Sequence, residues 1–129
     1  MTRPRILSVG QCSYDHGQIV HQIGKKLNAE IASADTHEEA IQVLRGAIFD
    51  LVLVNRVGDS DGASGLDLIR AIKADAATSA IPVMLVSNFD WAQNEAVALG
   101  AIPGFGKTDL NHGGVPASVE DALKPSRAV

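Results

Sequence analysis

The sequence is poor in the features that mark several protein classes. It has one cysteine, Cys12, so it cannot form an internal disulfide, and no Cys or His pair has the spacing of a structural zinc site. Its longest apolar stretches, such as residues 81–86, are far shorter than a bilayer span, and no basic segment followed by an apolar stretch opens the chain. These absences argue against a membrane protein and predict a cytoplasmic location.

Basic residues are also in the minority. Eleven Lys and Arg side chains stand against fifteen Asp and Glu, a net charge of −4, and the basic residues are scattered along the chain. Nucleic-acid-binding surfaces need clustered positive charge, so we expect no nucleic-acid partner.

The length and composition predict one globular domain. The 129 residues are 46% hydrophobic and 20% charged, which is enough apolar surface to bury a single core. We assign the domain to residues 1–129, with its core in about residues 5–123 and a short tail at 124–129.

Short apolar runs alternate with helical periodicity. Five runs predict strands at residues 5–9, 29–32, 51–54, 83–86 and 101–105, and the middle ones are continuously apolar, as in parallel strands covered on both faces. Between them, apolar residues recur every three or four positions, in the sets Ile19, Ile23 and Leu27; Ala40, Leu44 and Ile48; and Leu66, Ile69 and Ile72.

Capping residues mark the expected helix starts. Thr36 and Ser64 each have an acidic residue three positions on, Asp90 is a predicted N-cap, and Pro116 stands near the start of the last helix. The predicted fold is therefore α/β, a doubly wound five-stranded parallel sheet.

In such sheets ligands bind beyond the carboxyl ends of the strands, where strand order reverses. The side chains to consider are those that end the predicted strands: Gly10, Gln11, Cys12, Asn55, Arg56, Ser87, Asn88, Lys107 and Thr108.

Four segments resemble the receiver domains of two-component response regulators. They are FDLVLVN (49–55), GLDLIRAIK (65–73), IPVMLVS (81–87) and GAIPGFGK (100–107), and the resemblance runs from about residue 5 to residue 123. It implies the (βα)5 flavodoxin-like receiver fold and a role in phosphorelay signal transduction.

The resemblance also implies a degenerate phosphorylation pocket made of Gly10, Gln11, Asn55, Ser87 and Lys107. The family's phosphoacceptor aspartate falls on Asn55, and an amide oxygen is a poor nucleophile. Its metal-binding acid pair falls on Gly10 and Gln11, neither of which ionises. Ser87 and Lys107 match the family's hydroxyl and lysine. We therefore expect no phosphate, metal or cofactor at this position, and we expect Asn55 to hydrogen-bond the Lys107 ammonium group.

Receiver domains commonly bind partners through the last two helices and the strand between them. Phe89, Trp91 and Phe105 form the corresponding possible partner face here, for another protein or a homodimer. The family's aromatic switch position falls on Gly104, with Phe105 as its neighbour, and Thr108 replaces the proline that follows the family's lysine.

We interpret the chain as a pseudo-receiver, not an enzyme, that acts by phosphorylation-independent protein–protein interaction. One alternative is phosphorylation of a relocated acid, Asp59 or Asp61, with magnesium held by the loop after Asn55 or by Asp15. Another is nucleotide binding through Lys107, although residues 101–108 do not complete a phosphate-binding loop. The Asp59 to Gly62 segment is predicted as a polar turn rather than a calcium loop, and Cys12 with His16 is too small a set for a metal site.

Overall fold

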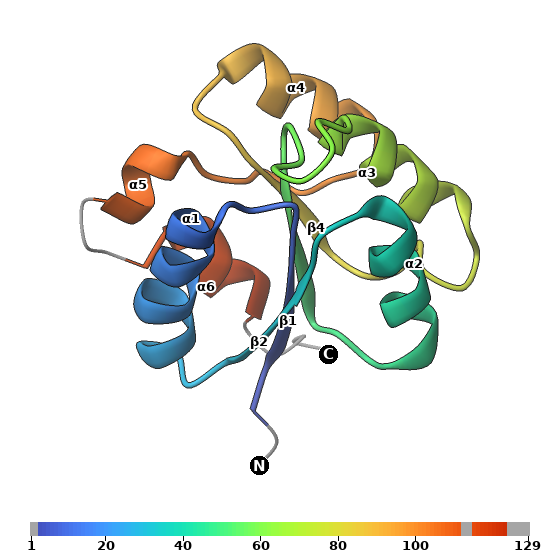
Figure 1. Ribbon diagram of the computed structural model, residues 1–129. Coiled ribbons are helices and arrows are strands. Elements are labelled where there is room, and N and C mark those ends of the chain that lie inside the picture. Colours follow the sequence, from blue (N-terminus) through green and yellow to red (C-terminus); the bar gives the residue numbers. More distant parts are fainter. Residues whose placement is uncertain (1–2, 112–114, 124–129) are drawn as a thin grey trace, which may run out of the picture.

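The computed structural model describes residues 3–111 and 115–123, and its centre is a parallel sheet. The strands are β1 (Arg5–Val9), β2 (Glu30–Ala34), β3 (Leu51–Asn55) and β4 (Val83–Val86), in the order β2-β1-β3-β4 (Figure 1). Strands β3 and β4 are buried along their whole length, as their continuous apolar sequences predict. The expected parallel α/β sheet is confirmed, whereas the predicted tail at 124–129 lies outside the described residues.

Helices cover both faces of the sheet (Figure 1). One layer contains α1 (Ser13–Gln18), the π-helix η1 (Ile19–Lys25), α5 (Lys107–Asn111) and α6 (Ala117–Leu123). The other contains α2 (His37–Gly46), α3 (Gly65–Ala74) and α4 (Asp90–Ala98). Ile19, Ile23 and Val119 pack in the first core, and Leu44 and Ile69 in the second. Within the two described ranges, no helix is long and apolar enough to cross a bilayer.

The predicted fifth strand is wrong. Residues 101–105 run beside β4 and share two backbone hydrogen bonds with it, from the Ile102 N–H to the Val83 carbonyl at 2.9 Å and from the Ser87 N–H to the Phe105 carbonyl at 3.0 Å, but this amounts to an isolated bridge between Phe105 and Val86 and not to a strand. The side chain of Gln93 explains the difference, because its amide donates to the Leu85 carbonyl at 2.9 Å and accepts from the Gly104 backbone N–H at 3.2 Å. Between these two backbone bonds, the Leu85 carbonyl and the Gly104 N–H are joined through the Gln93 side chain instead of to each other, so the pairing is interrupted there.

Gly104 allows this close approach. A Cβ atom at this position would clash with the backbone carbonyl of Leu85. Gly104 matches the family's aromatic switch position, and the backbone here leaves no room for any side chain at that position.

Two of the predicted helix boundaries need correction. Helix α2 ends at Gly46, so Ile48 lies outside the helix and is 83% exposed instead of packing on the sheet. Ser64 precedes α3 but makes no side-chain capping bond, whereas Thr36 caps α2 as predicted, accepting from the Glu39 N–H at 3.1 Å.

The chain after residue 86 also departs from expectation. Asp90 is the first residue of α4 rather than its N-cap. A short helix, α5, begins at Lys107 and was not predicted. The predicted last helix is α6, and the carbonyl of Pro116 accepts the Val119 and Glu120 N–H groups at its start.

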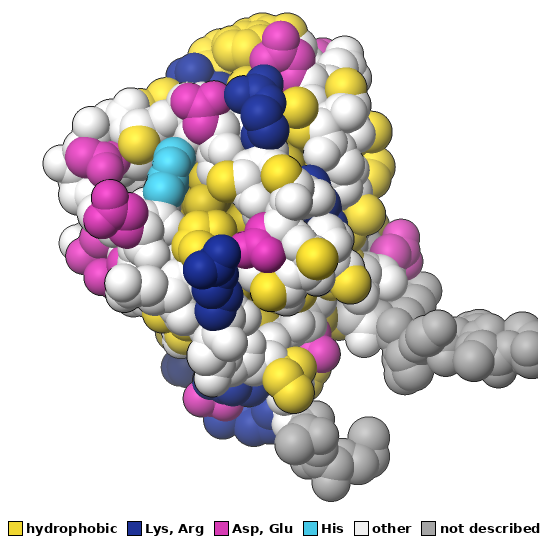
Figure 2. Space-filling view, turned by 90° about the vertical axis from the view of Figure 1, so that its right-hand side faces the viewer, with side chains coloured by type: hydrophobic (Ala, Val, Ile, Leu, Met, Phe, Trp, Pro, Cys, Tyr) yellow, Lys and Arg dark blue, Asp and Glu magenta, His cyan; other side chains and the backbone are white. Residues whose placement is uncertain are grey.

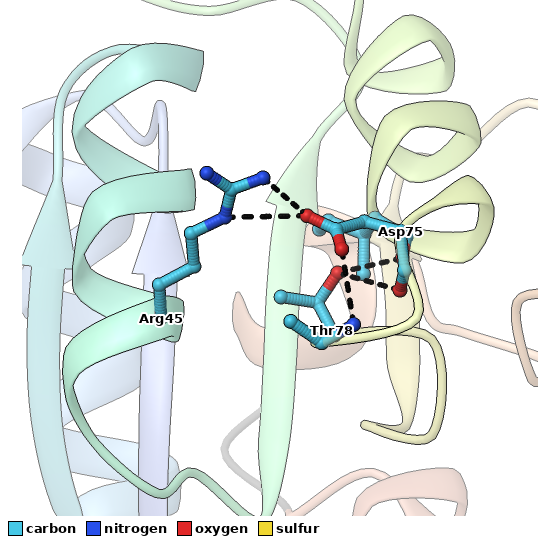
Figure 3. A network of polar contacts seen from close by, with 5 residues as sticks. Arg45, Asp75 and Thr78 are labelled. Atoms are coloured by element: carbon cyan, nitrogen blue, oxygen red, sulfur yellow. Dashed lines mark hydrogen bonds and ion pairs between the residues drawn. The ribbon is translucent and has the colours of Figure 1, made fainter.

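Polar contacts join the ends of α2 and α3. Arg45 reaches from α2 to Asp75, which follows α3, and its Nη2 lies 2.6 Å from Asp75 Oδ2 (Figure 3). The pKa of Asp75 is lowered, chiefly by the Arg45 hydrogen bond and then by the Ala77 backbone N–H. Thr78, buried beside them, donates its hydroxyl to the Ile72 carbonyl at 2.7 Å.

Candidate functional site

The carboxyl ends of β1 and β3 form the point where strand order reverses. From β1 the chain passes outward to β2 on one side and then returns to β3 on the other, so ligand sites in this fold class lie here. Gly10 follows β1 with φ of +72°, and a Cβ on it would lie 3.2 Å from the Gly58 Cα. A left-handed backbone costs an ordinary L-residue roughly 1–2 kcal/mol. The position therefore disfavours an acid on grounds of both conformation and space.

Asn55 ends β3 and closes this point with its amide. Its Nδ2 donates to the Gly10 carbonyl at 3.0 Å and to the Val57 carbonyl at 2.7 Å. The residue is 7% exposed, so both bonds lie in a largely dry environment. Both amide hydrogens are used to join the β1–α1 and β3–α3 loops.

Lys107 does not bond to Asn55, so that prediction is wrong. The Lys107 Nζ lies 2.9 Å from Asp15 Oδ2, and this ion pair joins the start of α5 to α1. Asp15 is only 8% exposed. Buried charges need partners, and the carboxylate on α1 supplies the partner that we had assigned to an amide.

The side chains of Ser87 and Asn88, which follow β4, both accept hydrogen bonds from nearby backbone N–H groups. The Ser87 hydroxyl accepts the Phe89 N–H at 3.1 Å and the residue is 5% exposed. The Asn88 Oδ1 accepts from the backbone N–H and the hydroxyl of Thr108, both at 3.2 Å. These contacts tie the β4–α4 connection to α5.

Gln11, which matches the second acid of the family's pair, has a different environment. Its side-chain nitrogen and oxygen are both enclosed, and neither has a hydrogen-bond partner in the part of the chain that the structure describes. Like Gly10, it supplies no anionic oxygen for a divalent ion.

The loop after Asn55 uses its two acids differently. Asp61 accepts the Ala63 N–H at 3.0 Å, forming the predicted polar turn, and Asp59 is exposed. Cys12 accepts the Asp15 N–H at the start of α1, while His16 lies 3.3 Å from the Ser8 hydroxyl. Across residues 3–111 and 115–123, no three His, Cys, Asp or Glu side chains gather as metal ligands would.

Two of the three residues predicted for a partner face are exposed. Phe89 and Trp91 are 50% and 54% exposed, and their ring centroids are 6.3 Å apart. The Arg56 guanidinium lies 4.9 Å from the Phe89 centroid and 5.7 Å from the Trp91 centroid. Phe105 is 4% exposed and packs in the core, so it cannot belong to this surface.

Sequence reasoning missed Arg56 as the cation over these rings and Asp15 as the partner of Lys107. Arg56 directly follows Asn55 and was predicted to lie at a strand end. No spacing rule, however, connects it to Phe89 and Trp91. Asp15 looks like any acid in a first helical turn, where such residues are common.

Two cavities lie near these elements. One of about 370 Å³ is lined by Ser87, Gln93, Thr108 and their neighbours, between the starts of α4 and α5. The other, of about 400 Å³, lies between α2 and α3, where Figure 2 shows a hollow with hydrophobic side chains. None of the residues of the predicted phosphorylation pocket lines the second cavity. This cavity is therefore distinct from the site at the carboxyl ends of the strands.

Comparison with known proteins identifies the fold. No protein-family profile matches the sequence, and no curated protein is significantly similar to it. Among solved structures, the chemotaxis response regulator CheY4 of Vibrio cholerae has a TM-score of 0.73 at 16% identity, over 95% of this chain and all of that one.

Two further structures give the same result. A two-component response regulator from Clostridium difficile has a TM-score of 0.74 at 19% identity, over 98% of this chain and all of that one. The signal receiver domain of a DNA-binding response regulator from Colwellia psychrerythraea has a TM-score of 0.73 at 23% identity, over 93% and 94%. The chain therefore has the fold of response-regulator receiver domains.

Proposed function

We propose that the chain is a receiver-fold signalling module that binds other proteins without accepting phosphate at Asn55 and without catalytic activity of its own. The observation that carries the proposal is the pair of hydrogen bonds from the Asn55 amide to the Gly10 and Val57 carbonyls. An aspartate here would direct a carboxylate oxygen, which cannot donate, toward two carbonyl oxygens.

The surroundings of Asn55 support the same proposal. Magnesium at a phosphoryl site takes carboxylate ligands, and neither Gly10 nor Gln11 offers one. Lys107, the cation that would pair with a phosphoryl group, is already paired with Asp15. Nucleophile, metal ligands and counter-charge thus all differ from what phosphoryl chemistry needs.

The departure is built into the backbone and not confined to side chains. Gly10 has a positive φ and lies against Gly58, so an acid placed there meets a strained conformation and a close contact. Restoring the chemistry requires changes in both loops. A cytoplasmic location is consistent with the single cysteine and is part of the proposal.

The test is intact-mass spectrometry after incubation with acetyl phosphate and Mg²⁺, with an active receiver domain treated in parallel. We expect no phosphoryl adduct on this chain and a clear adduct on the active receiver. Asn55→Asp is also expected to remain unlabelled, because it restores no metal ligand at Gly10 or Gln11.

A stoichiometric adduct on the wild-type chain would overturn the proposal. Peptide mapping then locates it, and modification of Asp59 or Asp61 identifies the relocated-acid alternative. Strong labelling of Asn55→Asp alone would equally contradict the argument from the missing metal ligands.

A further inference from the structure

An exposed patch of hydrophobic and basic side chains includes the two residues that follow Asn55. It consists of Arg56, Val57, Phe89 and Trp91, which we call the aromatic patch. Val57 is 42% exposed, and the two rings are about half exposed. Two large exposed aromatic side chains therefore lie against one guanidinium, and exposed Val57 is the next residue in the chain after that arginine.

Arg56 is held in place but its hydrogen-bond donors are not used. Its guanidinium carbon lies over both rings, a cation–π arrangement that fixes the side chain. Within residues 3–111 and 115–123 it forms no ion pair and donates no hydrogen bond. A guanidinium that is held near two aromatic rings and unpaired at its N–H groups is positioned to bind a carboxylate.

The same loop also carries an exposed carboxylate, whose negative charge complements the positive charge of Arg56. Asp59 is exposed and its side chain has no ion pair or hydrogen bond in the described chain. Its backbone N–H donates to the Gly10 carbonyl at 2.9 Å, which places it on the β1 side of the loop, whereas Arg56 lies against the residues that begin α4. A free cation and a free anion thus stand on opposite sides of one loop.

We infer that the aromatic patch binds a second copy of this chain through a two-fold interface. In such an interface each residue contacts its counterpart reciprocally, so Arg56 of each copy meets Asp59 of the other and the Phe89 and Trp91 rings are covered between them. The charge complementarity is internal to the surface, which is the condition for self-association rather than for a different acidic partner.

This inference rests on the proposed function, since it names one protein that the module binds. It differs from the partner face predicted from the sequence, because Phe105 is buried and the loop after β3 takes its place.

Charge-swap variants and sedimentation equilibrium test the inference. The wild-type chain is expected to show a monomer–dimer equilibrium. Arg56→Glu and Asp59→Arg each place like charges opposite one another twice in a symmetric dimer, so each should weaken dimerisation by about tenfold or more. An equimolar mixture of the two variants restores both opposite-charge pairs and should form a heterodimer about as well as wild type.

Arg70→Glu serves as the matched control, because Arg70 is an exposed arginine on α3 that pairs with Asp67 outside the patch. It should dimerise like wild type. Thermal unfolding by circular dichroism checks that each variant is folded.

A wild-type chain that stays monomeric at high protein concentration would overturn the inference. So would folded Arg56→Glu and Asp59→Arg variants that fail to associate when mixed, and so would specific cross-linking of the patch to a different protein by a monomeric chain. A monomeric chain without a phosphoryl adduct would refute the dimer and leave the proposed function intact. A dimeric chain that carries a phosphoryl adduct would refute the proposed function and leave the dimer intact.

Discussion

Lys107 on α5 and Asp15 on α1 form an ion pair with 2.9 Å between the ammonium nitrogen and the carboxylate oxygen. The pair joins the start of the short helix α5 to α1. It also occupies the lysine that a phosphoryl group would need. The contact is therefore structural, and in the proposed function it also keeps Lys107 from a phosphoryl group.

Asp15→Asn is expected to destabilise the protein. The variant leaves the partly buried Lys107 ammonium group without a counter-charge, and loss of a charged hydrogen bond of this kind costs about 1–2 kcal/mol where one partner is partly exposed. Chemical denaturation at pH 7 measures the change in the free energy of unfolding. Glu95→Gln, at an exposed carboxylate on α4, should change it by less than about 0.5 kcal/mol; equal effects of the two would contradict the role of the ion pair.

Substitution of Asn55 should separate two effects. Asn55→Ala removes both bonds to the Gly10 and Val57 carbonyls, and Asn55→Asp removes them and adds a negative charge facing those oxygens. We expect losses of about 1–3 kcal/mol for the alanine variant and more for the aspartate variant, because unpaired buried carbonyls are costly and a nearby anion is worse. Urea denaturation curves at pH 7 give the order, and an aspartate variant as stable as wild type would refute the geometry of the pocket.

The Arg45–Asp75 contact predicts a pH dependence. The pKa of Asp75 is lowered from its ordinary value of 3.8, first by the Arg45 hydrogen bond. A carboxyl with a lowered folded-state pKa stabilises the fold above its unfolded-state pKa, and that contribution disappears as the pH falls through the folded-state pKa. The stability advantage of wild type over Asp75→Asn should therefore be constant above about pH 5 and shrink below about pH 4.

Urea midpoints measured between pH 3 and pH 7 for both proteins provide that test. Glu95→Gln, which alters an exposed acid on α4, should run parallel to wild type across this range. A difference between wild type and Asp75→Asn that does not vary with pH would show that the Arg45 contact has no preference for the charged carboxyl.

Gln93→Ala is expected to loosen the segment from Ala101 to Phe105. The Gln93 amide donates to the Leu85, Ser87 and Phe105 carbonyls, at 2.9, 3.1 and 3.3 Å, and accepts the Gly104 N–H. Its removal leaves several partly buried backbone groups unpaired, at about 2–3 kcal/mol in total.

Amide hydrogen exchange of residues 101–105 measures this effect locally, and faster exchange confined to that segment is the expected result. Asn94→Ala, at the next and exposed position of α4, supplies the control. Unchanged protection in Gln93→Ala would show that the segment is held by its own backbone contacts instead.

The sequence was sufficient to predict elements whose apolar residues pack on the sheet. The buried strands β3 and β4 and the Ile19, Leu44 and Ile69 stripes follow from periodicity, since the two faces of a parallel sheet demand them. The last strand was not predictable in this way, because its apolar residues are present and two of its backbone bonds to the β4 edge form, whereas the interruption at Leu85 and Gly104 depends on the position of the Gln93 amide.

The site was harder to predict for a related reason. Gly10 and Asn55 lie at strand ends as predicted, because chain order and strand order determine their position, whereas Lys107 begins α5 and follows no strand. The partners of Asn55 and Lys107 were not predicted correctly, since Asn55 bonds to loop carbonyls and Lys107 to an acid on another helix. Hydrogen-bond choices of this kind depend on loop conformation, which leaves no periodic trace in the sequence.

The side-chain amide of Gln93 has a consequence for association between molecules. An outermost strand normally presents unsatisfied carbonyls onto which a neighbouring chain can add a strand of its own. The Leu85 carbonyl in β4 and the Ser87 carbonyl just after it each accept a hydrogen bond from Gln93, and residues 101–105 bond to the same edge. We therefore expect this border of the sheet to resist the addition of a strand from another molecule.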